Sequence, residues 1–120
     1  MKKSDYSNLS NRDSMFPKER RIRRRRKYDE QIKIVSRNID KVDIEVTGVD
    51  ISIYGIGFIS DSNFEKDDIL EMLFYYESIT IPAIIEVTHS NLYDDGFFTG
   101  GKFIGMQNLY REILREFLDK

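Results

Sequence analysis

The sequence has no cysteine and a single histidine, His89, in 120 residues. Without cysteine the chain has no disulfide, no thiolate nucleophile and no sulfur ligand for a metal. A lone histidine also excludes most zinc sites and His-based catalytic arrangements, so any catalysis would depend on carboxylates. The acidic groups at Glu65, Asp67–Asp68 and Asp94–Asp95 have no second chemical group beside them, and we interpret them as turns and solvated loops. We therefore do not expect an enzyme.

Long hydrophobic runs are also missing. No stretch approaches the roughly twenty apolar residues that a membrane-spanning helix needs. The first 14 residues, MKKSDYSNLSNRDS, lack the apolar core of a signal peptide. We expect a cytoplasmic protein without membrane insertion. Its length suits one domain with one modest core.

Charge is distributed unevenly along the chain. Residues 1–27 contain eleven Lys and Arg against three Asp and Glu, a balance of +8, whereas residues 28–120 contain eight against eighteen, a balance of −10. This polarity indicates a basic arm for an anionic partner, attached to an acidic globular body. Residues 1–18 are polar and show no apolar periodicity, so we expect them to be disordered.

From Tyr28 onward the pattern predicts short strands. Ile32, Ile34 and Ser36 share one face, and residues 42–47 alternate between apolar and polar. Gly55 interrupts the next apolar run, together with Gly57, and the pair indicates a turn or bulge. Further strands are predicted over 69–77, over 79–89 with a proline at an edge or bulge, and over 97–106 after a turn at 94–96.

The last 14 residues have a helical pattern, with apolar residues at Leu109, Ile113, Leu114, Phe117 and Leu118. Short antiparallel strands followed by one amphipathic helix predict an all-β fold with a C-terminal helix. We expect a small barrel of six or seven strands between about residues 28 and 106, closed by a helix over about 108–119.

An arginine-rich segment precedes the first predicted strand. It contains two overlapping RxxxR matches, which are Arg20 with Arg24 and Arg21 with Arg25. The pattern is a weak signal in a chain this rich in arginine. A further match, Arg111 with Arg115, is interpreted as a solvated face of the C-terminal helix.

A second motif, DxSxxG, consists of Asp50, Ser52 and Gly55. At average residue usage, a motif with three fixed positions occurs by chance in roughly a few per cent of chains of this length. A structural alternative is a capped turn, in which the Asp50 and Ser52 side chains bond to the local backbone and Gly55 supplies a positive φ.

These motifs, in this order and beside a barrel pattern, resemble the PilZ domain family of cyclic di-GMP receptors. The resemblance covers about residues 19–118, because residues 100–105, GGKFIG, are similar to the family's last barrel strand. It implies a PilZ domain over 19–120, with a ligand-binding arginine segment (19–27), a barrel (28–106) and a helix (108–119). It also implies a signalling receptor or adaptor that needs no cofactor. Such a protein binds cyclic di-GMP, orders its arginine segment on the barrel, and regulates a downstream protein in motility or exopolysaccharide production.

The ligand has two phosphates and two guanines. The planar fork of arginine binds phosphate or guanine O6 and N7 and also lies on a base face. Aspartate accepts from guanine N–H groups, and a serine hydroxyl adds an adjustable partner. The resemblance assigns ligand binding to Arg20, Arg21, Arg25, Asp50, Ser52 and Gly55.

The register of the arginine motif is open between Arg20/Arg24 and Arg21/Arg25. Distance to the first strand favours Arg25, and Arg20 then matches an additional arginine that often precedes the motif. Arg26 and the following lysine stand where the family usually has a small or apolar residue, often with a proline.

Two other functions fit part of the pattern. A nucleic-acid-binding protein would use the basic arm, residues 18–27, to neutralise phosphates. That hypothesis leaves DxSxxG unexplained, and the acidic body does not continue a basic surface, so no nucleic-acid partner is expected. A PilZ-like adaptor that acts only through protein contacts is the other alternative.

The remaining aromatic residues receive structural interpretations. We interpret His89 as a surface turn residue at a strand end. The group Phe74, Tyr75, Tyr76, Phe97 and Phe98 is interpreted as barrel filling on one face. Tyr54, inside the motif turn, is placed near the ligand.

Overall fold

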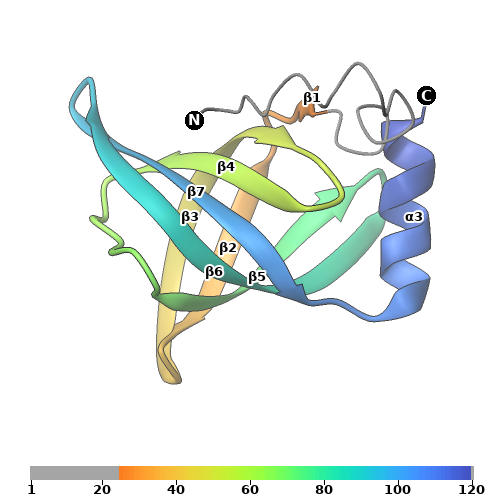
Figure 1. Ribbon diagram of the computed structural model, residues 1–120, viewed down its shortest axis with the longest axis horizontal. Coiled ribbons are helices and arrows are strands. Elements are labelled where there is room, and N and C mark those ends of the chain that lie inside the picture. The colour runs from red at the N-terminus through yellow and green to blue at the C-terminus, as the bar shows by residue number, and fades with distance from the viewer. Residues whose placement is uncertain (1–24, 120) are drawn as a thin grey trace, which may run out of the picture.

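The computed structural model describes residues 25–119 and consists of seven antiparallel strands followed by a helix (Figure 1). The elements are β1 (Arg26–Lys27), β2 (Gln31–Arg37), β3 (Asp40–Ile51), β4 (Gly55–Ser60), β5 (Ile69–Tyr76), β6 (Ile79–Tyr93), β7 (Gly96–Gly105) and α3 (Asn108–Leu118). The predicted all-β fold with a C-terminal helix is confirmed. Strand pairing begins at Arg26, slightly before the expected start at Tyr28. The predictions for residues 1–24 lie outside the described residues.

The strand order is β1-β3-β2-β5-β6-β7-β4, and an additional pairing of β3 with β4 closes β2–β7 into a barrel. The short β1 pairs with the end of β3 beyond its pairing with β2, with Arg26 opposite Ile51 and Lys27 opposite Asp50. This pairing places the end of the arginine segment beside the end of β3, where the DxSxxG motif begins.

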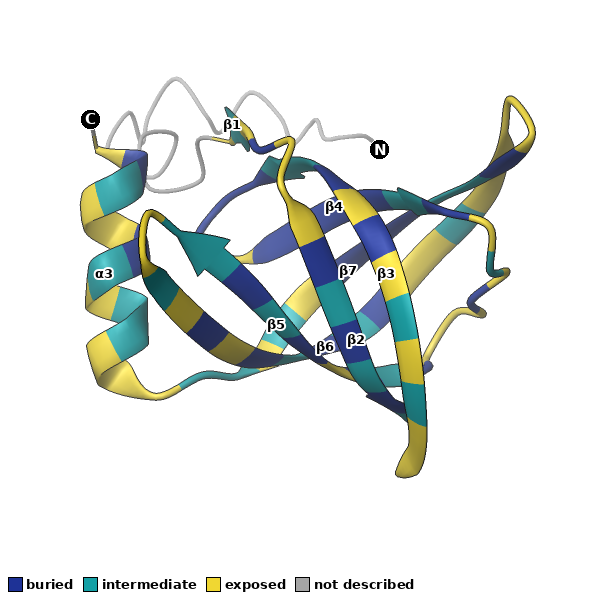
Figure 2. Ribbon diagram, turned by 180° about the vertical axis from the view of Figure 1, so that it is seen from behind, coloured by how far each residue is buried: buried dark blue, intermediate teal, exposed yellow. Residues whose placement is uncertain are grey.

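Alternation along the strands fills the barrel interior (Figure 2). Ile32 and Ile34 of β2 are buried on one face, as predicted. The expectation that Ser36 shares this face is wrong, because a bulge between Ile34 and Ser36 turns the Ser36 hydroxyl toward the exposed Glu71. Moving one such buried isoleucine side chain into water costs about 1.5–3 kcal/mol of transfer free energy. The interior also receives Val46, Ile51, Ile56, Phe58, Leu70, Met72, Phe74, Ile81, Ala83, Ile85 and Val87.

The two ends of the barrel are closed differently. Helix α3 covers one end and buries Leu114 and Leu118, while the loop over 61–68 lies at the other end (Figure 1). Phe64 of that loop is 1% exposed and meets Phe58 edge to face, with ring centroids 5.8 Å apart. In the described part of the chain, no helix has the length and apolar character needed to span a membrane.

Pro82 lies at an edge, as predicted. It pairs with Leu73 of β5, but the pairing of β6 with β7 ends at Ile84, opposite Gly105. A residue without a backbone N–H is tolerated here because one side of β6 has no partner strand at this point.

Bulges in β3 and β6 decide which side chains reach the outer surface near the motif. The register of β3 against β4 shifts between Gly48 and Asp50, and that of β6 against β7 shifts between Val87 and His89. An extra residue reverses the alternation, so the residue after it faces outward instead of inward. The interpretation of His89 as a turn residue is wrong, because β6 continues past it to Tyr93.

Candidate functional site

The DxSxxG motif forms the turn between β3 and β4. The backbone N–H of Ser52 donates to the carbonyl of Gly55 (2.9 Å), and the Ser52 hydroxyl accepts from the N–H of Tyr54 (3.1 Å). Ser52 is 1% exposed, whereas Tyr54 is 52% exposed. The serine therefore caps the turn, which agrees with one part of the structural alternative.

The glycine of the motif is needed for close packing and not for its backbone angles. None of the glycines in the described residues has a positive φ, so that part of the alternative is wrong. A Cβ on Gly55 would instead overlap the carbonyl oxygen of Gly101 in β7. Any side chain at this position would push β4 away from β7 and disturb the turn.

Arg25 lies against the motif. Its Nε donates to Asp50 Oδ1 (3.1 Å), its Nη2 forms an ion pair with the same oxygen (3.0 Å), and its Nη1 donates to Ser52 Oγ (3.4 Å). The Arg25 and Asp50 side chains remain 45% and 34% exposed. Three of the predicted site residues are thus together, and two of them, Arg25 and Asp50, are open to a ligand while Ser52 is buried. Arg20, Arg21 and Arg24 lie outside the described residues.

Two residues, Arg26 and Tyr28, anchor the chain directly after Arg25. Arg26 Nη1 donates to the carbonyl of Phe117 in the last turn of α3 (2.7 Å), and its guanidinium lies 5.3 Å from the centre of the Phe117 ring. A cation is favourable there because carbonyls at a helix C-terminus lack partners within the helix. The arginine that departs from the usual family pattern therefore attaches the arginine segment to α3.

Tyr28 is the second anchor. Its hydroxyl donates to the carbonyl of Tyr75 (2.6 Å) and accepts from the Tyr75 N–H (2.8 Å). Tyr28 thus satisfies both backbone groups of a β5 residue that lies beyond the last pair between β2 and β5. Burial raises the pKa of Tyr28 to about 12, so the group stays neutral at physiological pH. Its ring packs edge to face on Phe74 and Phe117.

Two aromatic side chains near the motif have roles that the sequence interpretation missed. The Phe98 ring lies over Gly57 of β4, and Gly57 stands opposite Asp50 of β3. Phe98 is half-buried on the outer surface of the barrel. The interpretation of Phe98 as barrel filling is therefore wrong. His89 is exposed and stacks with Phe98, with ring centroids 5.8 Å apart. Gly57 and Gly100, which lie within predicted strands, were the available signal for this surface.

The acidic groups noted in the sequence do not gather into a reactive site. Asp68 accepts from Arg37 Nε (2.9 Å), Asn38 Nδ2 (2.9 Å) and the Glu65 backbone N–H (2.9 Å). Partial burial acts to raise the pKa of Asp68, but these hydrogen bonds and the nearby guanidinium together hold it below its usual value. Asp68 is thus an ionised structural group. Within residues 25–119, no cluster of three or more His, Asp or Glu could hold a metal ion.

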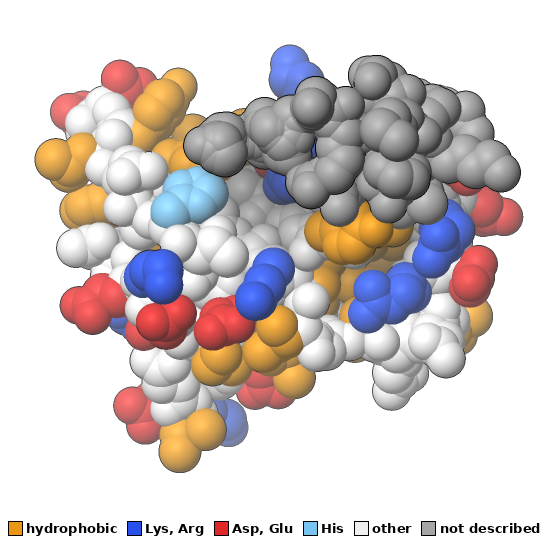
Figure 3. Space-filling model, viewed as in Figure 1, with side chains coloured by type: hydrophobic (Ala, Val, Ile, Leu, Met, Phe, Trp, Pro, Cys, Tyr) orange, Lys and Arg blue, Asp and Glu red, His pale blue; other side chains and the backbone are white. Residues whose placement is uncertain are grey.

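The charged side chains on the barrel are mixed in sign. On the face in Figure 3, basic side chains stand next to acidic ones and do not form a continuous basic surface. Charges of opposite sign on the barrel also form ion pairs, Lys33 with Asp43 (3.1 Å) and Lys102 with Glu86 (3.5 Å). Among the described residues seen on this face, the basic side chains therefore form no extended track for a nucleic-acid backbone.

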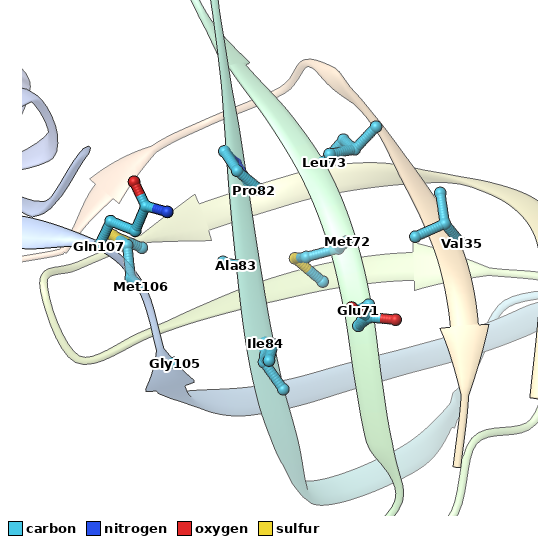
Figure 4. Close-up of a pocket in the computed structure, with 10 residues that line it drawn as sticks. All are labelled: Val35, Glu71, Met72, Leu73, Pro82, Ala83, Ile84, Gly105, Met106 and Gln107. Carbon is cyan, nitrogen blue, oxygen red and sulfur yellow. The ribbon is translucent and has the colours of Figure 1, made fainter. Parts of the chain in front are cut away.

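A pocket of about 380 Å³ lies at β5 and β6, near the end of β7, and its lining reaches the core residues Met72 and Ala83 (Figure 4). Its lining is mostly apolar and its charged member is Glu71, whose carboxylate accepts from Ser36 (2.7 Å). Because no cation lines this pocket, it is unsuited to a phosphate-bearing ligand. The lining residues are Val35, Glu71, Met72, Leu73, Pro82, Ala83, Ile84, Gly105, Met106 and Gln107.

Comparisons with known proteins find similarity among solved structures and not among sequences. No family model matches the sequence, and no curated protein does. The fold matches the solved structure of Bacillus subtilis Inhibitor of motility (MotI/DgrA) with a TM-score of 0.67, at 12% sequence identity over 79% of this chain. The match covers 47% of that protein, so this chain spans about half its length. At this identity the likeness concerns the fold, and the chain has a PilZ-like barrel with a C-terminal helix.

Proposed function

We propose that this protein is a PilZ-type signalling receptor that binds cyclic di-GMP where the arginine segment meets the DxSxxG turn. The observation that carries the proposal is the contact of Arg25 with both Asp50 and Ser52. Arg25, from the arginine segment, lies against the DxSxxG turn although Asp50 is 25 residues further along the chain, and this is the pairing that the family resemblance implies. The same contact favours the Arg21/Arg25 register, with Arg20 as the additional arginine.

The residues of this surface suit a cyclic dinucleotide. The Arg25 guanidinium is open enough to turn toward guanine O6 and N7 or toward a phosphate. Asp50 supplies carboxylate oxygens for guanine N–H donors. Ser52 is buried and already bonded to Tyr54 and Arg25, so we assign it to positioning the turn and the guanidinium. Gly55 keeps this turn close to β7.

Ligand binding would also order the arginine segment. Its basic side chains repel one another until the two ligand phosphates neutralise them. Arg26 and Tyr28 give the segment a fixed base on α3 and β5. Arginines placed N-terminal to this base then need only close onto the ligand.

The output of the receptor is proposed to be a protein contact in the cytoplasm and not a reaction. The structural match is named an inhibitor of motility, which favours regulation of motility over exopolysaccharide production. An adaptor with the same fold but no ligand is the alternative. It predicts that cyclic di-GMP has no effect on the protein.

The experiment is a calorimetric titration of the full chain with cyclic di-GMP, comparing Arg25→Ala with Arg115→Ala. Arg115 belongs to the RxxxR match on α3 and is exposed, so this control makes the same change in charge away from the motif. Loss of a bidentate arginine contact worth about 1–3 kcal/mol weakens affinity roughly five- to 150-fold. We expect that loss for Arg25→Ala and unchanged affinity for Arg115→Ala. Equal losses in both variants would indicate attraction by net charge and would contradict the site.

A further inference from the structure

Four residues form a row across the outer surface of the barrel. Asp50 in β3 stands opposite Gly57 in β4, Gly57 stands opposite Gly100 in β7, and Gly100 stands opposite His89 in β6. Both end residues follow a bulge, in β3 and in β6. The row therefore has a carboxylate at one end, an imidazole at the other and two glycines between them.

The glycines allow aromatic rings to rest on the strand backbone. A Cβ on Gly57 would lie 2.8 Å from Asp50 Oδ1 and 2.9 Å from Phe98 Cζ. A Cβ on Gly100 would overlap the His89 ring. The His89 and Phe98 rings are 29° from parallel, with centroids 5.8 Å apart. Together they make an aromatic platform, hereafter the His89–Phe98 platform, and Asp50 adjoins it at Gly57.

Hydrogen bonds orient the imidazole. The Thr88 hydroxyl donates to the carbonyl of Gly100 (3.0 Å) and lies 3.1 Å from His89 Nδ1. Since that hydroxyl has one proton, a neutral His89 donates from Nδ1 to Thr88 and keeps Nε2 as an acceptor. Thr88, which lies at the bulge between Val87 and His89, thus holds the imidazole ring in place on the surface.

We propose that the His89–Phe98 platform is a stacking surface for one guanine of the cyclic dinucleotide. The inference rests on the proposed function and adds a base subsite to it. Aromatic side chains at the surface bind bases through their faces, at about 1–3 kcal/mol per base. A purine lying on this platform has its edge next to Asp50, whose oxygens accept from guanine N–H groups but find no such pair of donors on the adenine ring edge. The platform supplies affinity for a base, and Asp50 with Arg25 selects guanine.

The test uses three variants of the full chain in titrations with cyclic di-GMP. His89→Ala should weaken binding roughly five- to 150-fold, which is the fold-change for a stacked base. His89→Phe keeps a ring and should stay within about threefold of wild type, a difference below 1 kcal/mol. Thr80→Ala is the matched control, because Thr80 is exposed on the same strand about 30 Å away at 3.3 Å per residue. It should bind like wild type.

Nuclear magnetic resonance supplies a readout that does not depend on affinity. His89 is the single histidine of the chain, so its ring C–H signals need no further assignment. A guanine stacked on the imidazole should move both signals upfield at saturating cyclic di-GMP, whereas guanine-free pyrophosphate should leave them in place.

The outcomes separate this inference from the proposed function. Binding that depends on Arg25 but is unchanged in His89→Ala, with no upfield shift of the His89 signals, would overturn the platform and leave the receptor intact. Absence of cyclic di-GMP binding by the wild type would overturn both.

Discussion

Replacement of Asp50 by alanine should weaken cyclic di-GMP binding while leaving the fold stable. The two effects separate because the Asp50 carboxylate faces solvent as well as Arg25. With side chains 34% and 45% exposed, the Asp50–Arg25 ion pair is worth about 0–1 kcal/mol to folding. For a domain of this size, that corresponds to a fall in Tm of at most about 5 °C.

The binding effect is larger and has an informative sign. Asp50→Ala removes a negative charge facing an anionic ligand, which by itself would tighten binding. It also removes the acceptor for guanine N–H groups and the oxygen that holds the Arg25 guanidinium at 3.0 Å. Loss of base recognition worth about 1–3 kcal/mol should dominate and weaken affinity roughly five- to 150-fold.

The assay is calorimetry at near-physiological salt, with urea unfolding of the same variant as the stability measurement. Unchanged or tighter binding in Asp50→Ala would refute the reasoning, because a purely electrostatic arm binds its anion the same or better after an acid is neutralised. A large loss of stability would instead assign Asp50 a structural role.

Three further substitutions test the parts of the structure that support the site. Tyr28→Phe leaves the Tyr75 N–H and carbonyl without their partner and should cost about 1–3 kcal/mol in urea unfolding; a change below 0.3 kcal/mol, roughly the scatter of surface substitutions, would contradict the anchor. Gly55→Ala should destabilise by about 1–3 kcal/mol through overlap with the Gly101 carbonyl and also weaken ligand binding, and a variant as stable as wild type would show that β4 and β7 separate freely. Because the folded-state pKa of Asp68 is lowered, its contribution to stability is present above its unfolded pKa of about 3.9 and is lost as pH falls through the folded value. Asp68→Asn should therefore make the free energy of unfolding less dependent on pH below about 4. A pH profile equal to that of wild type would exclude this role.

The barrel could be predicted because its core follows a simple period. Ile32 and Ile34 alternate with polar residues, and a period of two predicts a half-buried strand whatever its partners are. Pro82 at an edge and the apolar spacing of the last helix also depend on local chemistry alone. The DxSxxG turn could also be predicted, because its three residues lie within one short stretch of sequence at a fixed spacing.

The outer surface was harder to predict because bulges arise from pairing between strands. Continued alternation from Val87 places His89 inside the barrel, and only the shifted register against Gly100 places it outside. Phe98 likewise looks like a core residue until its ring is seen over Gly57, a residue of another strand. Arg26 departed from the usual pattern in sequence, and its contact with the Phe117 carbonyl depends on how α3 packs.

The most direct test of the account is titration of the wild-type protein with cyclic di-GMP, with GTP, GMP, cyclic di-AMP and an unrelated DNA duplex as controls. We predict saturable binding of cyclic di-GMP at near-physiological salt and much weaker binding of every control. Absence of cyclic di-GMP binding would contradict the central claim. So would equal binding of the duplex that falls steeply with salt, which would instead identify the arginine segment as a nucleic-acid-binding arm.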